Sequence, residues 1–211
     1  MKEENEKWLE KLVAAFGRCR EELEREKGEG KGEGGSIDFI AYVDACSLIQ
    51  DVFGHLGSVF EFAKKDLVDK EAQLRRNCGN RKISVREAIT ADFEDGRAVA
   101  GTSNSRTLHR VTNSVKFLNL LLVDLLRDDN KDHLRVSAHR AFKGSIEYYL
   151  AWPVKKAVGV GLYLLPSRDK FLKRIGETLE SAKPLAKEVV ECSSPVLDHV
   201  YGIYKDLGID L

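Results

Sequence analysis

One stretch near the middle of the chain, residues 105–127, constrains the fold most strongly, because its first half is cationic and its second half is almost wholly apolar. Apolar residues recur in the second half at the three- and four-residue spacing of one helix face: Val115, Leu118, Leu121, Leu122 and Leu125. Upstream, Arg106 and Arg110 are four residues apart, so a helix places both guanidinium groups on one face. The stretch predicts a long helix with an anion-binding group at one end and an apolar wall at the other.

The composition favours a single domain built from helices. The chain has 211 residues, enough for one sizeable core, with 43% hydrophobic and 32% charged residues. It contains only four prolines, and the clusters of β-branched residues that mark strands are sparse. Periodicity predicts about eight helices, several of them long, packed in layers. No apolar run reaches the ~20 residues needed to span a bilayer.

The charge balance and the motif content argue against nucleic-acid binding and against catalysis. Lys and Arg total 34, as do Asp and Glu, so the chain lacks the basic excess of a nucleic-acid-binding protein. Its histidines match no metalloenzyme motif, and no Ser or Cys lies in a nucleophile motif. The four cysteines lack metal-ligand spacing and no signal peptide is evident, so we expect reduced thiols in a cytoplasmic protein. We expect neither an enzyme nor a metal or cofactor site.

The N-terminal region is predicted to be an amphipathic helix, over residues 2–27, followed by a glycine-rich segment. Residues 28–35 read GEGKGEGG, and Gly30, Gly32 and Gly35 formally fit the dinucleotide motif G-x-G-x-x-G. A helix and not a strand precedes them, so we interpret the segment as a flexible linker. We expect residues 1–35 to form part of the same domain as residues 36–211.

Further helices are predicted on both sides of the central one. A long helix covers residues 38–75, with interruptions at Gly54 and Gly57, and a short one covers 84–93, where Ser84 and Glu87 have capping-box spacing. The predicted C-terminal helical segments are 134–149, 154–165, 168–179, 184–192 and 195–207, the last two beginning at prolines.

Three motifs resemble those of the glycolipid transfer protein superfamily. They are Asp66-x-x-x-Lys70, Arg106-x-x-x-Arg110 opening an apolar helix, and Trp152 followed from Lys155 by KKAVGVGLYLLP. Arg110 stands where sugar-binding members carry Trp, so the chain resembles the ceramide-1-phosphate transfer branch, of the plant accelerated-cell-death type. The resemblance covers residue 38 to the C-terminus. It implies a two-layer, all-α sandwich of about eight helices, with residues 36–211 as a lipid-transfer domain that holds lipid chains between the layers.

The resemblance also implies roles for four polar residues. Asp66 would accept a hydrogen bond from a ceramide amide N–H, while Lys70, Arg106 and Arg110 would hold the phosphate. A phosphomonoester carries about −1.5 to −2 charges at pH 7, so three cations beside one carboxylate roughly balance it. Without the resemblance these are ordinary solvated charges, since an exposed Asp–Lys pair four residues apart contributes only about 0.3–0.5 kcal/mol.

One position departs from the family pattern and leaves the function open. The family places a His two residues before the Trp, where it donates to the amide carbonyl, and here that position is Leu150. His139 lies eleven residues upstream, roughly 16 Å away along a helix, too far to replace it. We therefore consider a carrier that moves an anionic phosphosphingolipid, ceramide-1-phosphate above all, between membranes. The alternatives are a lipid sensor of altered selectivity, for example toward a glycerophospholipid, and a helical adaptor without a lipid pocket.

Apolar and basic residues complete the predicted site. We predict that six apolar residues contact the lipid chains: Phe39, Phe53, Phe60, Phe117, Leu118 and Leu122. Trp152 lies near the headgroup or the membrane face, or else is an ordinary core residue. Five basic residues either form a rim that attracts anionic headgroups or are ordinary solvated side chains: Lys155, Lys156, Arg168, Lys170 and Lys173. We expect a monomer that contacts membranes transiently from the cytoplasm and whose partner is a phospholipid or phosphosphingolipid.

Overall fold

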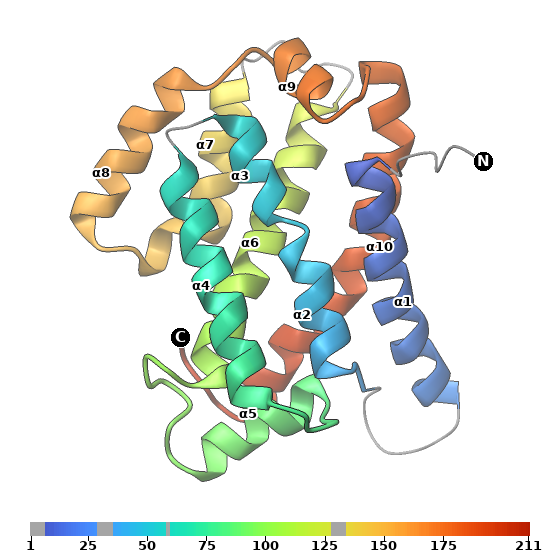
Figure 1. The fold of residues 1–211 in the computed structure, drawn as a ribbon, viewed down its shortest axis with the longest axis vertical. Helices are drawn as coiled ribbons and strands as arrows, with labels where there is room; N and C mark the ends of the chain where they lie inside the picture. Colours follow the sequence, from blue (N-terminus) through green and yellow to red (C-terminus); the bar gives the residue numbers. More distant parts are fainter. Residues whose placement is uncertain (1–6, 29–35, 58–59, 128–133) are drawn as a thin grey trace.

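A computed structural model describes residues 7–28, 36–57, 60–127 and 134–211. These residues form helices and contain no β-strand, apart from an isolated bridge between Asp38 and Ser84. The all-α prediction is therefore confirmed (Figure 1). The predicted glycine-rich linker, with its dinucleotide-like motif, and the polar segment 128–133 lie outside the described residues.

Ten α-helices and two short 3₁₀-helices follow one another in the part of the chain that the structure describes. They are α1 (Trp8–Gly28), α2 (Phe39–Ser47), α3 (Gln50–Leu56), α4 (Glu61–Cys78), α5 (Val85–Glu94), α6 (Asn104–Leu125), α7 (Leu134–Ser145), η2 (Glu147–Tyr149), α8 (Trp152–Gly161), η3 (Leu162–Leu164), α9 (Arg168–Arg174) and α10 (Leu179–Asp206). The count exceeds eight because the helix predicted for residues 38–75 forms three helices, and because the helices predicted for 134–149 and 154–165 each end in a separate 3₁₀-helix.

The central helix of the fold is α6, which contacts α2, α4, α5, α7 and α10. Helix α1 packs on α2 and α10, both α2 and α3 pack on α4, and α4, α7 and α10 pack on α6, which gives the layered arrangement of Figure 1. The predicted apolar wall of α6 is buried along its length, including Val115, Leu118, Leu121 and Leu125. None of the described helices is long and apolar enough to cross a bilayer.

The long helix predicted for residues 38–75 is broken at two places. Gly57, with a φ of 122°, ends α3 in a conformation that other residues rarely adopt, which agrees with the interruption predicted there. The interruption predicted at Gly54 is wrong, because Gly54 lies inside α3. The break after Ser47 is unexpected from the sequence. There the carbonyl of Leu48 accepts a hydrogen bond from the indole nitrogen of Trp8, at 2.8 Å, so a residue of α1 satisfies a carbonyl that the helix leaves free.

The start of α5 agrees with the predicted capping box. The Glu87 backbone N–H donates to the Ser84 hydroxyl at 3.1 Å, and the Ser84 backbone N–H donates to the Glu87 carboxylate at 2.6 Å. This reciprocal pairing satisfies two helix-terminal donors within four residues of sequence, so the signal is purely local.

The C-terminal region forms one helix where two were predicted. Helix α10 continues through both Pro184 and Pro195, and both prolines are exposed. A proline removes one backbone hydrogen bond, but on a solvent-facing side of a helix water can hydrate the carbonyl that is freed. The opposite side of α10 is buried, including Val189 and Val196, and its packing on α1 and α6 keeps the helix continuous.

Candidate functional site

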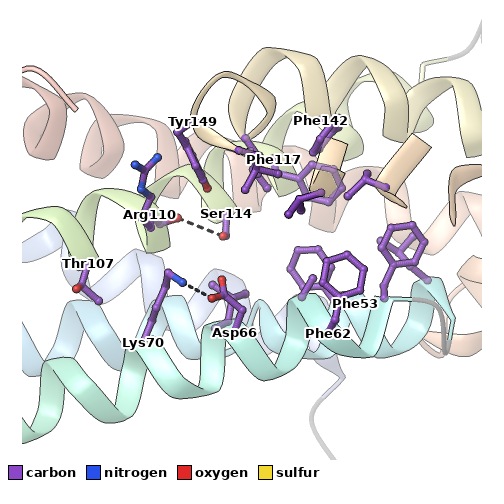
Figure 2. A pocket seen from close by; sticks show the side chains of 18 of the residues that line it. Phe53, Phe62, Asp66, Lys70, Thr107, Arg110, Ser114, Phe117, Phe142 and Tyr149 are labelled. Carbon is purple, nitrogen blue, oxygen red and sulfur yellow. Dashed lines mark hydrogen bonds and ion pairs between the residues drawn. The ribbon is translucent and has the colours of Figure 1, made fainter. Parts of the chain in front are cut away.

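A cavity of about 570 Å³ opens between α4 and α6, and α3, α7, η2 and α8 complete its walls. Its lining changes in character from one end to the other (Figure 2). One end carries the polar side chains of α4 and α6 together with Tyr149. The other end is lined by apolar side chains: Phe53, Leu56, Phe60, Phe62, Leu67, Phe117, Ala138, Phe142, Ile146, Val154, Val158 and Leu162.

The structure brings the four predicted headgroup residues to the polar end of the cavity. Asp66 and Lys70 lie one turn apart on α4 and form an ion pair, while Arg106 and Arg110 lie one turn apart on the facing helix α6. The Lys70 side chain is 23% exposed and the Asp66 side chain 61%, so the carboxylate is the more accessible to solvent. Three cationic groups and one carboxylate thus lie together at the polar end of the cavity, which we call its mouth. Their contact with a phosphate stays a prediction.

Arg110 is the most unusual of the four. Its guanidinium carbon lies 3.6 Å from the centre of the Tyr149 ring, in a cation–π arrangement. Its Nη1 atom is buried without a hydrogen-bond partner among the described residues. Burial lowers the pKa of Arg110, and the nearby Arg106 lowers that pKa further, yet a guanidinium in a protein stays protonated. A buried, unsatisfied cationic donor is costly, so this end of the cavity is suited to an anion.

Arg106 is positioned by the loop between α5 and α6. Ser103 caps α6 by accepting from the Arg106 backbone N–H at 3.0 Å, and the Arg106 guanidinium donates to the Val99 carbonyl at 2.9 Å. The loop also contributes Gly101 to the cavity wall. The loop therefore holds both the backbone and the guanidinium of Arg106 in place.

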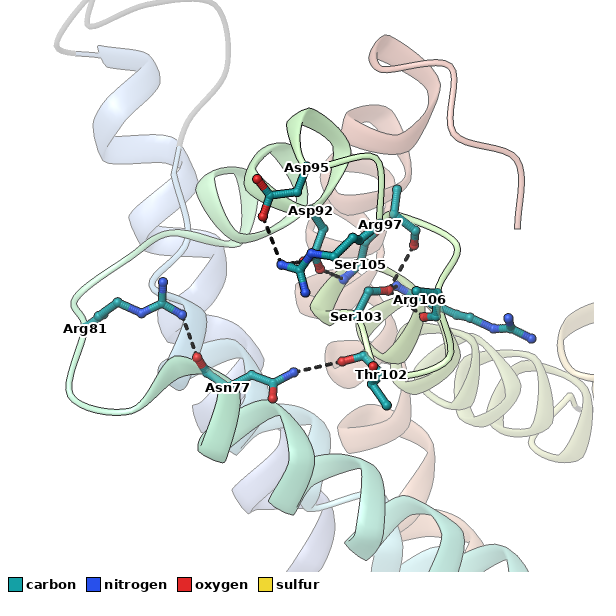
Figure 3. A network of polar contacts seen from close by, with 11 residues as sticks. Asn77, Arg81, Asp92, Asp95, Arg97, Thr102, Ser103, Ser105 and Arg106 are labelled. Atoms are coloured by element: carbon teal, nitrogen blue, oxygen red, sulfur yellow. Dashed lines mark hydrogen bonds and ion pairs between the residues drawn. The ribbon is translucent and has the colours of Figure 1, made fainter.

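That loop is itself held by a polar network (Figure 3). The buried carboxylate of Asp92 accepts from the Ser105 backbone N–H at 2.8 Å and from the Arg97 guanidinium at 3.1 Å. Asn77 on α4 donates to the Thr102 carbonyl at 3.0 Å. These bonds connect the loop to α4, α5 and α6, so the position of Arg106 depends on all three helices.

Neutral polar residues that the sequence prediction missed also line this end. Gln73 of α4 donates to the Thr107 hydroxyl of α6 at 2.7 Å, and Ser114 lies one turn beyond Arg110. Tyr149 faces them from η2. Gln73, three residues after Lys70, and Ser114, four residues after Arg110, continue the helical spacings that begin at Asp66 and Arg106. Ordinary polar residues, however, carry no signal that distinguishes a cavity from solvent.

His109 projects about 100° away from Arg110 around α6, as the helical angle between neighbouring residues requires. It is only 8% exposed and packs edge-on against Tyr148, Tyr201 and Tyr204. Burial lowers its pKa to about 4, with a smaller contribution from Arg110. The ring is neutral at physiological pH and belongs to the core behind the site.

The apolar end includes only some of the residues predicted to contact lipid chains. Phe53, Phe60 and Phe117 line the cavity, and the rings of Phe53 and Phe117 stack with their centres 5.8 Å apart. Phe39 and Leu118 are fully buried in the core and do not line it, while Leu122 lines a separate hollow between α6 and α10. Helical periodicity shows which residues are buried, but not whether the buried face meets another helix or a cavity.

The wall formed by α7 and α8 was also absent from the prediction. Ala138, Phe142 and Ile146 follow one another at intervals of four residues, a spacing that marks one face of the predicted helix over 134–149. Val154 and Val158 repeat this spacing on α8. The signal was present in the sequence, but an ordinary core face would have the same pattern.

Leu150, two residues before α8, and Trp152, the first residue of α8, lie in different surroundings. Leu150 lines the cavity, so the position where the family carries its His does face the site. Trp152 does not line it and is 70% exposed, so the interpretation as a core residue is wrong. Lys155 and Lys156 lie in the first turns of α8, whereas Arg168, Lys170 and Lys173 lie on α9 (Figure 1). None of the five lines the cavity, and the basic rim stays a prediction.

Comparison with known proteins agrees with this geometry. Residues 37–177 match the family model described as Glycolipid transfer protein (GLTP). The chain is 29% identical over 168 residues to Accelerated cell death 11 of Arabidopsis thaliana, covering 79% of this chain and 81% of that protein. It is 26% identical over 178 residues to the ceramide-1-phosphate transfer protein of Danio rerio, covering 79% and 82%. A crystal structure of an Arabidopsis ACD11 point mutant complexed with C12 ceramide-1-phosphate matches with a TM-score of 0.87 and 25% identity, covering 97% of this chain and 100% of that chain.

Proposed function

Because the chain belongs to the glycolipid transfer protein family, we propose that it carries an anionic phosphosphingolipid, ceramide-1-phosphate in the first place, between membranes. Similar proteins are named as ceramide-1-phosphate transfer proteins, and a similar structure holds that lipid. The observation that carries the proposal is the cavity itself, in which a cationic mouth with an unsatisfied Arg110 nitrogen leads into an apolar interior. An amphiphile with a phosphate at one end and hydrocarbon at the other matches both halves.

The phosphate binds, in this proposal, to Lys70, Arg106 and Arg110. Two guanidinium groups offer several charge-assisted hydrogen bonds to phosphate oxygens, and the ammonium group of Lys70 adds a point charge. Asp66 reduces the excess positive charge and accepts a hydrogen bond from a donor next to the phosphate, such as an amide N–H. A neutral sugar headgroup would leave the cations without a partner, so the site favours an anionic lipid.

The apolar end of the cavity takes the hydrocarbon chains. Each methylene group moved from water into an apolar environment gains ~0.8 kcal/mol, so a lipid leaving a membrane unaided faces a large barrier. Phe53, Phe60 and Phe117 provide part of a surface that replaces the bilayer around the chains. The protein thereby lowers the cost of extracting the lipid.

Helix α8 is our candidate for the surface that meets the membrane. Val154 and Val158 of this helix line the cavity, while large apolar side chains of the same segment are exposed. The exposed ones, between 68% and 73% accessible, are Trp152, Val160, Tyr163 and Leu164. Trp and Tyr favour membrane interfaces, and clustered exposed apolar side chains mark interaction surfaces. A helix with one apolar face toward the cavity and another toward solvent would place the cavity next to the bilayer.

Transfer between vesicles tests the proposal directly. Fluorescent ceramide-1-phosphate would be followed from donor to acceptor vesicles with wild type, Arg106→Ala and Arg110→Ala. We expect each variant to slow transfer by roughly tenfold or more, because hydrogen bonds to charged groups contribute about 1.5–3 kcal/mol.

The matched control for that assay is Arg18→Ala, an exposed arginine of α1 that does not line the cavity. Arg110→Lys adds a second comparison, since it keeps the charge but loses the planar fork. Circular dichroism would establish that all variants fold. Transfer by both alanine variants at the wild-type rate would show that these arginines do not hold the phosphate.

The second candidate function is a lipid binder or sensor with altered selectivity, and Leu150 is the observation in its favour. Its side chain lines the cavity but cannot donate a hydrogen bond to an amide carbonyl. This alternative predicts that Leu150→His increases the affinity for ceramide-1-phosphate relative to phosphatidic acid severalfold, with Leu150→Ala as control. An unchanged preference in a vesicle-binding assay would count against it.

A further inference from the structure

We propose that Tyr149 determines specificity for the part of the lipid just below the phosphate, by donating a hydrogen bond from its hydroxyl group to the carbonyl that links the headgroup to a hydrocarbon chain. The inference rests on the proposed function and adds a residue that the motifs do not include. It gives the site a donor for a lipid carbonyl, although the adjacent residue, Leu150, has none on its side chain.

Tyr149 lines the cavity at its polar end, next to Arg110. Figure 2 shows its ring beside Arg110 with the hydroxyl directed into the cavity, toward Ser114. On α6 the polar lining ends at Ser114, and the next cavity residue is Phe117. The Tyr149 hydroxyl therefore lies where the lining changes from polar to apolar. In a ceramide phosphate or a diacyl phosphatidic acid, the linking carbonyl occupies the same transition, between the phosphate and the chains.

A lipid carbonyl at this level of the cavity needs a hydrogen-bond donor. A carbonyl oxygen buried without a hydrogen bond costs about 1–3 kcal/mol. The cations at the mouth face the phosphate, and Asp66 is an acceptor. Of the neutral donors there, the Ser114 hydroxyl donates to the Arg110 carbonyl at 3.3 Å. The Gln73 amide donates to the Thr107 hydroxyl, and Thr107 lies further from the apolar end than Tyr149 does (Figure 2). Leu150 has no donor on its side chain, which leaves the Tyr149 hydroxyl as the suitable group.

The Tyr149 ring is held in place by two neighbouring side chains. One face of the ring carries the Arg110 guanidinium, at 3.6 Å, and the Tyr148 ring packs edge-on against it with centres 5.0 Å apart. The 3₁₀ turn beneath is closed by a hydrogen bond from the Leu150 N–H to the Glu147 carbonyl at 3.1 Å. Burial raises the pKa of Tyr149, so its hydroxyl keeps its proton at physiological pH and can donate it. A donor held in this way loses little conformational freedom when lipid binds.

Tyr149→Phe distinguishes the contribution of the hydroxyl from that of the ring. The variant keeps the stacking on Arg110 but has no donor, whereas Tyr149→Leu removes both. Tyr148→Phe is the matched control, because its hydroxyl hydrogen-bonds Asn113 on the side of His109 and does not line the cavity. Each protein would be titrated with vesicles that contain ceramide-1-phosphate labelled with ¹³C at the amide carbonyl, and the infrared amide band of the bound lipid would be recorded.

We expect Tyr149→Phe to weaken binding roughly three- to tenfold, the size of one net hydrogen bond, and to move the labelled carbonyl band to higher wavenumber. Tyr148→Phe should change neither. An unchanged carbonyl band in Tyr149→Phe would overturn the inference, whether or not the affinity falls, since a purely structural tyrosine would leave that band in place. If the wild type bound no ceramide-1-phosphate at all, the proposed function would fail first, and this role with it.

Discussion

Two neighbouring residues of α6, Arg110 and His109, lie in different environments, and these environments decide whether each side chain is charged. Arg110 borders the cavity and stays charged, whereas His109 is buried among three tyrosines and is neutral. Asn113, one turn further, donates to the backbone carbonyl of His109 at 2.9 Å and to the Tyr148 hydroxyl at 3.1 Å. The angle between the two residues follows from helix geometry, but the tyrosines that surround His109 come from η2 and α10.

The buried His109 predicts that the protein loses stability in mild acid. Its pKa is lowered to about 4 in the fold, from an ordinary value of 6.5, so between these values the unfolded chain binds more protons than the folded one. The free energy of unfolding therefore falls as the pH falls, by roughly 2 kcal/mol between pH 7 and pH 5 from this residue alone.

Urea unfolding of wild type and His109→Gln at pH 7 and pH 5 measures this contribution. Carboxylates and other histidines titrate in both proteins, so the difference between the two pH dependences isolates His109. We expect the glutamine variant to start from a lower stability and to lose less of it in acid. Parallel pH dependences in the two proteins would show that His109 is not held in its neutral form.

At the scale of elements, the clearest case is α10, where packing overrides a local signal. Pro184 and Pro195 lie on its exposed side, and the buried side continues without interruption along α1 and α6. By contrast, the capping box at the start of α5 was correctly predicted, because Ser84 and Glu87 satisfy each other without any distant partner. Local rules hold where the interaction is local, and they fail where tertiary contacts contribute more free energy than one lost hydrogen bond.

Substitution of a proline in α10 tests this balance. Pro195→Ala restores a backbone donor in a helix interior, where proline is about 3 kcal/mol less favourable than alanine in an unperturbed helix. Since α10 already accommodates the proline, and alanine makes the unfolded chain more flexible, we expect a smaller gain in the free energy of unfolding, roughly 1–2 kcal/mol.

Chemical denaturation checks the expected gain, with Glu188→Ala as the control. Glu188 is exposed on α10 between the prolines, and its substitution should change stability by less than about 0.5 kcal/mol. A destabilised Pro195→Ala would mean that α10 needs the bend at the proline to follow its neighbours.

At the scale of the whole molecule, the helix layers are in contact in one region and leave a cavity in another. Where α1 packs on α10, Leu9 and Leu12 of α1 are fully buried. Where α4 faces α6, the layers separate enough to leave the cavity. The motifs Asp66-x-x-x-Lys70 and Arg106-x-x-x-Arg110 are about forty residues apart in the chain, and they form one site only because these two helices face each other.

By itself the sequence determined the helical class, most of the helix positions, the capping of α5 and the pairing of charges along single helix faces. Each of these depends on hydrogen bonds and side-chain spacing within a few residues. Only the tertiary structure decided that Phe53 lines a cavity while Phe39 packs in the core, and that Arg110 stacks on Tyr149 with one nitrogen unsatisfied. A cavity is a region where two layers fail to close, and that depends on how distant helices approach each other, which no local pattern encodes.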